Sequence, residues 1–225
     1  MLPDCGTEHH NQHRRADMRI GIIGAGHIGA TLARLLVGAG HEVAISNSRG
    51  PESLAGLVGA LGAGAHAATV ADAAAFGELV IEAIPFGRYA TLPAPALAGK
   101  IVVTASNYYP QRDGTIDLGG RAQSELLTGH LAGARVVKAF NTIWYQHLQT
   151  QGDRSKPLEA RRVIFLSGDD PAAKQVVADL VEQLGFGPLD LGALRDSAQQ
   201  EPGAPIYNND LTVAEARNML AQRAR

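Results

Sequence analysis

The chain has 225 residues, of which 45% are hydrophobic, and its formal net charge is −2 at pH 7. A chain of this length and composition can bury one substantial core, so two full domains are not expected. The near-neutral charge gives no electrostatic basis for binding nucleic acid or an anionic membrane.

The N-terminal segment, residues 1–17, contains the single cysteine, Cys5, and several histidines. One cysteine allows no internal disulfide and suits a reducing, cytoplasmic compartment. The segment lacks the apolar region of a signal peptide, and no run in the chain reaches the roughly 18 apolar residues of a membrane span. We expect a disordered leader before Met18, with metal chelation by its histidines as the alternative.

The first predicted strand covers residues 18–23 and leads into the sequence Gly24-Ala-Gly26-His-Ile-Gly29. An amphipathic segment, residues 28–37, follows and predicts a helix. This order is typical of a dinucleotide-binding site, in which Gly24 permits a tight turn, Gly26 leaves space for a pyrophosphate and Gly29 lets the helix pack on the strand. Unpaired N–H groups at the start of the helix favour the pyrophosphate.

The second predicted strand, residues 41–46, ends in Asn47-Ser48-Arg49. Sites selective for NAD place Asp or Glu at this point to bind the ribose 2′-hydroxyl. Here no carboxylate is present, and Arg49 can offer a planar set of donors to a 2′-phosphate while Ser48 and Asn47 add short donors. The sequence therefore favours NADP(H) over NAD(H). A polar turn before a helix that begins at Pro51 is the alternative interpretation.

Short strands and helices then alternate as far as residue 140, which predicts an α/β fold with a doubly wound, mostly parallel sheet of the Rossmann type. The predicted strands of this part are residues 65–68, 78–84, 99–104 and 134–140. The predicted helices are residues 51–61, 72–76 and 120–129, with a helix broken by proline at 89–97.

Beyond residue 140 the pattern predicts a strand at 162–167, a helix from Asp170-Pro171 to Gly185 and one more strand at 186–191. This part is too short to bury a separate core, so we expect it to extend the same sheet. One domain would then cover residues 18–195. A loop and a polar helix from about Thr212 would complete residues 196–225.

Candidate binding residues follow two central strands, because ligands of open α/β sheets bind at the carboxyl ends of the strands. Pro85 can shape the backbone under the nicotinamide ribose, and Phe86 can supply an aromatic wall. Asn107 has donors and an acceptor suited to a ribose or a carboxamide. The structural alternatives are a proline that ends a strand, a core phenylalanine and a turn asparagine.

The strand at 134–140 carries Lys138 and Ala139 close to its end. Lys138 can steer an anionic substrate or contact solvent, and we favour the second interpretation. Ala139 is small enough to leave room for a flat ring over the nicotinamide. Trp144 and Tyr145 follow in a predicted loop and either line that space or cover the edge of the sheet.

Residues typical of other chemistries are missing from the sequence. No cysteine follows the leader, no histidines have the spacing of metal ligands, and no serine lies in a Gly-x-Ser-x-Gly motif. We therefore assign no catalytic residue and no metal ligand. Hydride transfer remains, in which the cofactor carries the reaction and the protein holds two rings face to face.

Together these segments resemble the NADPH:coenzyme F420 oxidoreductase family, a Rossmann group related to the nicotinamide-binding part of pyrroline-5-carboxylate reductases and to STEAP-type metalloreductases. The resemblance rests on residues 18–29, 47–49, 84–85, 136–142, 167–174 and 184–192. It implies that residues 25–28 hold the pyrophosphate, that Ser48 and Arg49 hold the 2′-phosphate, and that Ile84 and Ala139 lie near the nicotinamide and the deazaflavin.

The predicted cofactor-binding set is Gly24, Ala25, Gly26, His27, Ile28, Asn47, Ser48, Arg49, Ile84, Pro85, Asn107 and Ala139.

The resemblance also implies direct hydride transfer between NADPH and a 5-deazaflavin without an obligatory acid or base, and it suggests a homodimer. The chain departs from the family at residues 207–213, which are polar where an apolar final helix is expected.

We therefore expect an NADP(H)-dependent oxidoreductase whose partner is a small-molecule redox acceptor, coenzyme F420 or another flavin-like ring. A non-catalytic NADP(H)-binding redox sensor is the main alternative, because no acid, base or nucleophile is identifiable. An imine reductase is a weaker alternative, because the long helical C-terminal domain of the pyrroline-carboxylate enzymes has no counterpart here.

Overall fold

The first strand, β1 (Arg19–Ile23), forms at the first apolar run, and each of its residues after Arg19 is buried. Strands of a parallel sheet are covered on both faces, so a continuous apolar run is expected there. The structure is a computed structural model that describes residues 17–223. The leader expected at residues 1–17 thus lies outside the described residues, apart from Asp17.

Within residues 17–223, eight strands form one sheet in the order β3-β2-β1-β4-β5-β6-β7-β8, which confirms the predicted α/β fold. Neighbouring strands are parallel except for the antiparallel pair β6 and β7. The strand order reverses between β1 and β4, which is where such sheets open a crevice for ligands. The other strands are β2 (Glu42–Ser46), β3 (Ala65–Ala67), β4 (Leu79–Glu82), β5 (Ile101–Thr104), β6 (Arg135–Ala139), β7 (Val163–Gly168) and β8 (Gly187–Asp190).

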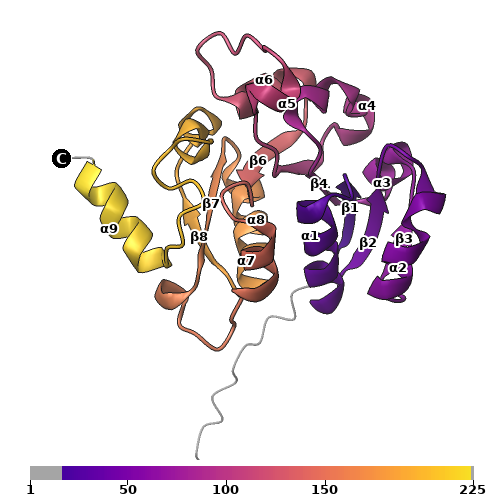
Figure 1. Ribbon diagram of the computed structural model, residues 1–225, viewed down its shortest axis with the longest axis horizontal. Coiled ribbons are helices and arrows are strands. Elements are labelled where there is room, and N and C mark those ends of the chain that lie inside the picture. Colours follow the sequence, from indigo (N-terminus) through magenta and orange to yellow (C-terminus); the bar gives the residue numbers. More distant parts are fainter. Residues whose placement is uncertain (1–16, 224–225) are drawn as a thin grey trace, which may run out of the picture.

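Helices cover both faces of this sheet. The α-helices are α1 (His27–Gly38), α2 (Ala55–Leu61), α3 (Val70–Phe76), α4 (Ala94–Leu97), α5 (Pro110–Asp113), α6 (Gln123–His130), α7 (Tyr145–Thr150), α8 (Pro171–Gln183) and α9 (Val213–Arg223). The 3₁₀-helices are η1 (Pro51–Leu54), η2 (Phe86–Thr91), η3 (Leu158–Ala160) and η4 (Leu194–Gln200). In Figure 1, β3 and α2 stand at one end of the molecule and β7, β8 and α9 at the other.

The core has a main cluster on each face of the sheet. Leu32 and Leu36 of α1, Leu148 of α7 and Leu180 of α8 are buried in the first cluster. The second cluster lies under η2, α4 and α6 and includes Phe86. This arrangement is the three-layer packing expected of a doubly wound sheet.

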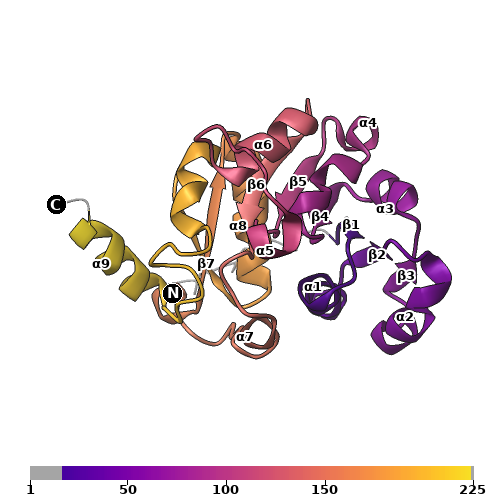
Figure 2. The same cartoon turned by 45° about the horizontal axis from the view of Figure 1, so that its top comes forward.

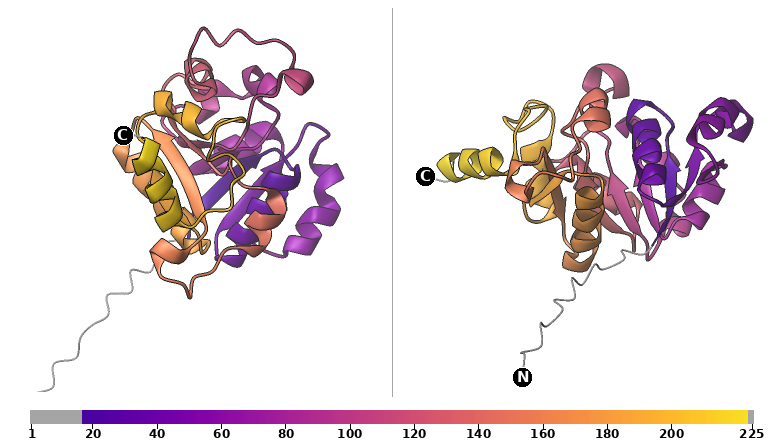
Figure 3. Two further views of the ribbon diagram at one scale, coloured as in Figure 1. Left: turned by 60° about the vertical axis from the view of Figure 1, so that its left-hand side comes forward. Right: turned by 90° about the horizontal axis from the view of Figure 1, so that it is seen from below.

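The segment beyond β6 extends the same sheet, as the sequence predicts. Asp170 begins α8 by accepting hydrogen bonds from the backbone N–H groups of Ala172 and Ala173, and Pro171 is the first helical residue. Helix α9 adds a third cluster by packing Val213 and Ala216 against Val163 and Phe165 of β7. The right-hand view of Figure 3 shows α9 at the outer edge of the molecule.

The antiparallel direction of β7 determines where the C-terminal segment lies. Because β7 runs against β6, its first residues lie near the last residues of β6, at the carboxyl edge of β1 and β4–β6. The segment before α9 returns to this edge, where Val163 donates a hydrogen bond from its backbone N–H to the carbonyl of Leu211. The C-terminal segment therefore reaches the edge at which ligands bind.

Four short helices of the described chain, α5, α7, η3 and η4, were not predicted from the sequence. α7 occupies the expected loop after Trp144, and only Leu148 among its residues is buried. α5 is a single turn that begins at Pro110, and η4 spans the expected domain boundary at residue 195. Segments this short carry no hydrophobic periodicity from which to predict them.

Among the described residues, no helix is both long enough and apolar enough to cross a lipid bilayer.

Candidate functional site

The glycine-rich turn joins β1 to α1 at the carboxyl edge of the sheet. Gly24 has a φ of 113°, and a Cβ there would lie 2.5 Å from the carbonyl oxygen of Ala83. At Gly29 a Cβ would lie 1.8 Å from the carbonyl oxygen of Gly24, whereas at Gly26 it would meet nothing within 4 Å. Gly24 and Gly29 are thus required by the fold, and Gly26 keeps an open space free.

The first turn of α1 borders that open space. Gly26 is the N-cap residue and supplies no side chain, and the backbone N–H of Ala30 makes the first helical bond, to the carbonyl of Gly26. The N–H groups of His27 and Ile28 therefore have no partner within the helix. Together with the helix dipole, such groups make a binding site for an anion.

A cavity of about 590 Å³, which we call the β2-side cavity, lies between the glycine turn, the end of β2 and η2. The residues that line it are Ile23, Gly24, Ala25, Gly26, Asn47, Ser48, Arg49, Val70, Ala83, Ile84, Pro85, Arg88, Thr91 and Leu92. The structure thus brings the glycine turn and the predicted 2′-phosphate residues to one cavity.

The end of β2 is ordered by its own side chains. The Oδ1 atom of Asn47 accepts a hydrogen bond of 2.9 Å from the backbone N–H of Arg49, and its Nδ2 atom donates to the Oγ atom of Ser53 at 2.9 Å. Asn47 therefore shapes the turn, while Ser48 and Arg49 are exposed. In the described part of the chain the guanidinium of Arg49 has no hydrogen-bond or ion-pair partner.

Arg88 of η2 lines the same cavity and was missed in the sequence. Its side chain is exposed and likewise has no partner among residues 17–223, so two uncompensated guanidinium groups face one cavity. The sequence places Arg88 three residues after Pro85, in a segment without a clear periodicity. One signal could have identified Arg88: it is a positively charged residue that follows shortly after the strand end at Pro85, where the sequence already predicted binding residues.

A second cavity of about 400 Å³, which we call the β5-side cavity, adjoins the first. Gly26, Ala83, Ile84 and Pro85 line both cavities. The other residues of the β5-side cavity are His27, Ile28, Ala105, Ser106, Asn107, Tyr109, Arg112, Phe140, Asn141, Ile143, Trp144, Tyr145, Tyr207 and Asn208. Helices α1, α5 and α7 contribute to this lining, and Figure 2 shows α1 and α7 close to each other.

Several aromatic residues line the β5-side cavity. His27 and Tyr145 stack with ring centroids 4.3 Å apart and an angle of 16° between their planes. Trp144 beside them is 52% exposed. Phe140 has a φ of 62°, in the left-handed region that a bulky residue rarely adopts, and this conformation accompanies its place in the lining.

Asn107 lies at the floor of this cavity and is almost completely buried. Its Nδ2 atom donates to the backbone carbonyl of Asn141 at 2.8 Å, and its Oδ1 atom accepts from Nδ2 of Asn141 at 2.9 Å. The amide of Asn107 thus links the segment after β5 to the segment after β6, and the residue also lines the cavity, while its role in binding stays a prediction.

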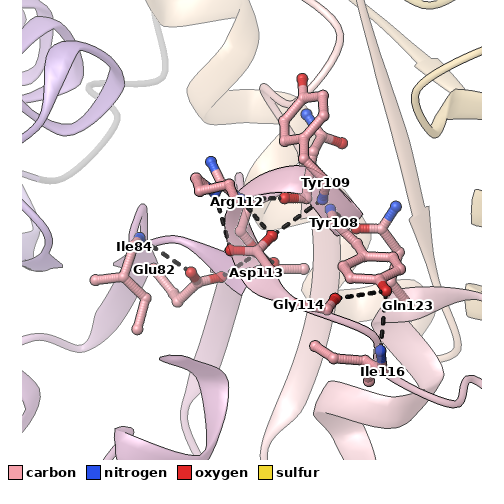
Figure 4. A network of polar contacts seen from close by, with 12 residues as sticks. Glu82, Ile84, Tyr108, Tyr109, Arg112, Asp113, Gly114, Ile116 and Gln123 are labelled. Carbon is pink, nitrogen blue, oxygen red and sulfur yellow. Dashed lines mark hydrogen bonds and ion pairs between the residues drawn. The ribbon is translucent and has the colours of Figure 1, made fainter. Parts of the chain in front are cut away.

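The segment after β5 is held by an ion pair. Arg112 and Asp113 approach to 2.8 Å, and Asp113 also accepts a hydrogen bond of 3.0 Å from the backbone N–H of Tyr109. Arg112 donates in addition to the carbonyl of Asn107 at 2.6 Å. These contacts fix the one turn of α5 and the position of Tyr109 (Figure 4).

Ala139 is the one member of the predicted cofactor-binding set that lines neither cavity. It is completely buried in the core, and the next two residues, Phe140 and Asn141, line the β5-side cavity although they are buried as well. Phe86 is also buried in the core and lines neither cavity, so the structural alternative holds for it.

Lys138 does not contact solvent, and that expectation was wrong. Its side chain is 1% exposed, and its Nζ atom donates to the carbonyl of Ser106 at 3.0 Å. Burial lowers the pKa of Lys138 to about 8, against the attraction of Glu201 and Glu82. A residue in a central strand is covered on both faces, which the sequence position alone does not reveal.

Glu82, which the sequence did not single out, lies under the same edge. Burial raises the pKa of this carboxyl, while hydrogen bonds from Thr104, Ile84 and Ser106 and the charge of Lys138 act in the opposite direction. The backbone N–H of Ile84 donates to Oε1 of Glu82 at 3.1 Å, a contact drawn in Figure 4. Glu82 thus fixes the strand end that both cavities share.

The C-terminal segment completes the β5-side cavity. Tyr207 and Asn208 line it, and the backbone N–H of Asn208 donates to the carbonyl of Thr142 at 3.1 Å. Arg162 secures the following residues by donating to the carbonyl of Asn209 and pairing with Asp210 at 3.0 Å. The sequence suggested only a polar loop here, because these contacts join residues far apart in the chain.

Comparison with known proteins agrees with this geometry. The pattern of the family described as NADP oxidoreductase coenzyme F420-dependent matches residues 19–108. The hypothetical protein SMa0349 of Sinorhizobium meliloti is 38% identical, with a TM-score of 0.78 over 87% of this chain and 95% of that chain. A proposed F420-dependent NADP reductase from Arthrobacter sp. FB24 is 31% identical, with a TM-score of 0.69 over 81% of this chain and 87% of that chain.

A curated relative extends the comparison to larger proteins. The metalloreductase STEAP3 of Rattus norvegicus is 32% identical over 185 residues, which are 81% of this chain and 36% of the relative. The chain thus spans about a third of the length of the curated relatives that it matches most extensively.

Proposed function

We propose, because the chain belongs to the family of coenzyme F420-dependent NADP oxidoreductases, that it transfers hydride between NADPH and a flat acceptor, either coenzyme F420 or a flavin-like ring. The family and the Rossmann fold support binding of NADP(H). The acceptor and the residue assignments below are the proposed parts.

The residues of the β2-side cavity fit the phosphate-bearing half of the cofactor. Gly26 leaves a space that a Cβ would fill, and the first N–H groups of α1 border it, so this turn would hold the pyrophosphate. Ser48 and Arg49 would bind the 2′-phosphate, and Arg88 would bind it from the other wall. The absence of a carboxylate at the end of β2 removes the repulsion that a phosphate would meet there.

The shared lining of the two cavities carries the proposal. Because Gly26, Ile84 and Pro85 border both cavities, a cofactor that crosses this point would have its phosphates in the β2-side cavity and its nicotinamide at the β5-side cavity. A second ring could then lie against the nicotinamide within the aromatic wall. Cofactor and acceptor would meet without any residue between them.

The chemistry would come from the bound nicotinamide, which supplies a hydride to the acceptor. The chain would contribute position and environment. The His27–Tyr145 stack and Trp144 offer flat surfaces to a ring, and Asn107 and Ile84 would bound the nicotinamide. Aromatic side chains around the ring would also exclude water from the reacting atoms.

A panel of acceptors tests this proposal. Purified protein is mixed with NADPH and, separately, with oxidised coenzyme F420, FMN and a ferric chelate, the last because the STEAP relatives are metalloreductases. We expect NADPH-dependent reduction of coenzyme F420 or FMN, with NADH a much poorer donor. Tight NADPH binding without reduction of any acceptor would contradict the proposal and favour the redox sensor.

A further inference from the structure

Two tyrosines from distant parts of the chain meet at the β5-side cavity. Tyr109 directly precedes α5, Tyr207 belongs to the C-terminal segment, and both side chains line the cavity. Their hydroxyl groups are hydrogen-bonded to each other. Neither hydroxyl has a role in the function proposed above.

The pair has one more proton than it uses. Two hydroxyl groups carry two protons, and the contact between them occupies one. The other hydrogen-bond neighbours of the pair are Nδ2 of Asn107, a donor that lies 3.5 Å from the Tyr207 oxygen, and the side chain of Asn208, whose hydrogen bond lowers the pKa of Tyr207 as that of a donor does. Among residues 17–223, the second hydroxyl proton therefore has no acceptor, and it remains for a ligand.

The phenol of Tyr207 remains a protonated donor at neutral pH. Burial, and then the neighbouring Tyr109, raises the pKa of Tyr207 above that of a free phenol. The guanidinium of Arg112, which is paired with Asp113, lies 5.0 Å from the centre of the Tyr109 ring. A site with a hydroxyl proton that has no other acceptor favours negative charge on a bound group.

The pair is also held in place from both sides. Tyr109 is fixed by its backbone bond to Asp113, and Tyr207 precedes Asn208, whose φ of 51° is a left-handed conformation that asparagine tolerates. The backbone bond from Asn208 to Thr142 anchors this turn. Donors fixed before the ligand binds need no reorganisation during the reaction.

We propose that the hydroxyl pair of Tyr109 and Tyr207 donates a hydrogen bond to the acceptor, and that the acceptor carries a carbonyl oxygen or ring nitrogen which gains negative charge when the ring is reduced. This inference rests on the function proposed above. It narrows the acceptor to rings with such an atom conjugated to the reduced position, and it makes the two tyrosines catalytic residues.

The test uses Tyr109→Phe, Tyr207→Phe and the double variant, with Tyr89→Phe as the matched control. Tyr89 packs on Phe86 and lines neither cavity. Each single variant should reduce coenzyme F420 or FMN about 100-fold more slowly, the scale of losing one fixed donor from a site of developing charge. The double variant should be no slower than the worse single variant, because the two hydroxyls act as one unit.

Binding measurements separate this inference from the proposed function. NADPH affinity should be the same in all variants, whereas binding of oxidised FMN or coenzyme F420 to the NADP⁺ complex should weaken in Tyr109→Phe and Tyr207→Phe only. If wild type binds the ring in this tyrosine-dependent way but never reduces it, the proposed function is wrong and the donor site stands. Ring binding and turnover that are unchanged in the double variant, or no ring binding at all, would refute the donor site.

Discussion

The three glycines of the first turn show how residues of one type serve different ends. Gly24 and Gly29 are packed against backbone atoms of the fold, and Gly26 borders open space. Gly26 should therefore be needed for ligand binding but not for folding. The sequence predicted these separate tasks, because the pattern fixes which glycine makes the tight turn, which one leaves space for the pyrophosphate and which one lets the helix pack on the strand.

Gly26→Ala should fold with unchanged stability and lose cofactor binding. Its methyl group meets no protein atom within 4 Å but occupies the space next to the free N–H groups of α1. We expect an NADPH dissociation constant at least about 10-fold higher, equivalent to about 1.4 kcal/mol.

Gly29→Ala is the contrast, since its methyl group would collide with the carbonyl of Gly24 and destabilise the protein by about 1 to 3 kcal/mol. Titration and urea unfolding measure both effects; normal NADPH binding by Gly26→Ala would refute the assignment.

Arg49→Ala and Arg88→Ala should each weaken NADPH binding while leaving NADH binding nearly unchanged. Both side chains line the β2-side cavity, and a charge-assisted hydrogen bond to a phosphate contributes about 1.5 to 3 kcal/mol. The expected increase in the NADPH dissociation constant is thus about 10- to 100-fold. Arg154→Ala, an exposed residue that lines neither cavity, is the control. An equal loss for NADH would show that these residues do not bind the 2′-phosphate.

At the scale of elements, the ends of β4, β5 and β6 form a polar floor inside an apolar sheet. Glu82, Thr104 and Lys138 are all buried there, and Thr104 donates to Glu82 at 2.7 Å. The sequence showed these residues in strand positions but not that their side chains meet. Such contacts depend on strand order and register, which one chain's local pattern does not contain.

Lys138→Met tests this floor through the pH dependence of stability. The pKa of Lys138 is about 8 in the folded protein and near 10.5 when the chain is unfolded, because burial disfavours the ammonium form. Below pH 8 Lys138 is charged in both states, and its burial as an ammonium destabilises the folded protein. Between pH 8 and 10.5 the folded protein has lost this proton while the unfolded chain still holds it, so the free energy of unfolding of wild type should rise relative to that of Lys138→Met. The expected gain is about 2 to 3 kcal/mol in the free energy of unfolding.

Urea unfolding of both proteins at pH 7 and pH 10 measures this gain. Lys156→Met, which removes an exposed lysine, should differ from wild type by a similar amount at both pH values. The account is contradicted if the difference in the free energy of unfolding between wild type and Lys138→Met is the same at both pH values. It is also contradicted if Lys138→Met becomes relatively more stable at pH 10.

The order and kind of the longer elements were predictable, and the short elements around the cavities were not. α1, α8 and the strands carry apolar runs or stripes and strong end signals, such as Asp170-Pro171. α5, α7 and η4 have one or two turns, and long-range contacts stabilise them. Arg88, Tyr109 and Tyr207 were therefore missed as site residues, because the segments that present them have no pattern of their own.

At the scale of the whole molecule, the antiparallel turn into β7 has a functional consequence. It brings the C-terminal segment back to the edge where the first six strands place the glycine turn and Asn107. The β5-side cavity is thus closed by residues from both ends of the described chain. The sequence predicted that this part extends the sheet, but it did not give the direction of the added strands.

The central claim is that two adjoining cavities let a hydride pass directly from NADPH to a flat ring. Stopped-flow mixing of the protein–NADPH complex with oxidised coenzyme F420, followed by deazaflavin absorbance, tests it most directly when repeated with NADPH deuterated at the transferred position. We predict that the absorbance falls in a single turnover, more slowly with the deuterated cofactor, and that the deuterium is found in the reduced ring. Constant absorbance, or a reduced ring that carries no deuterium, would contradict the account.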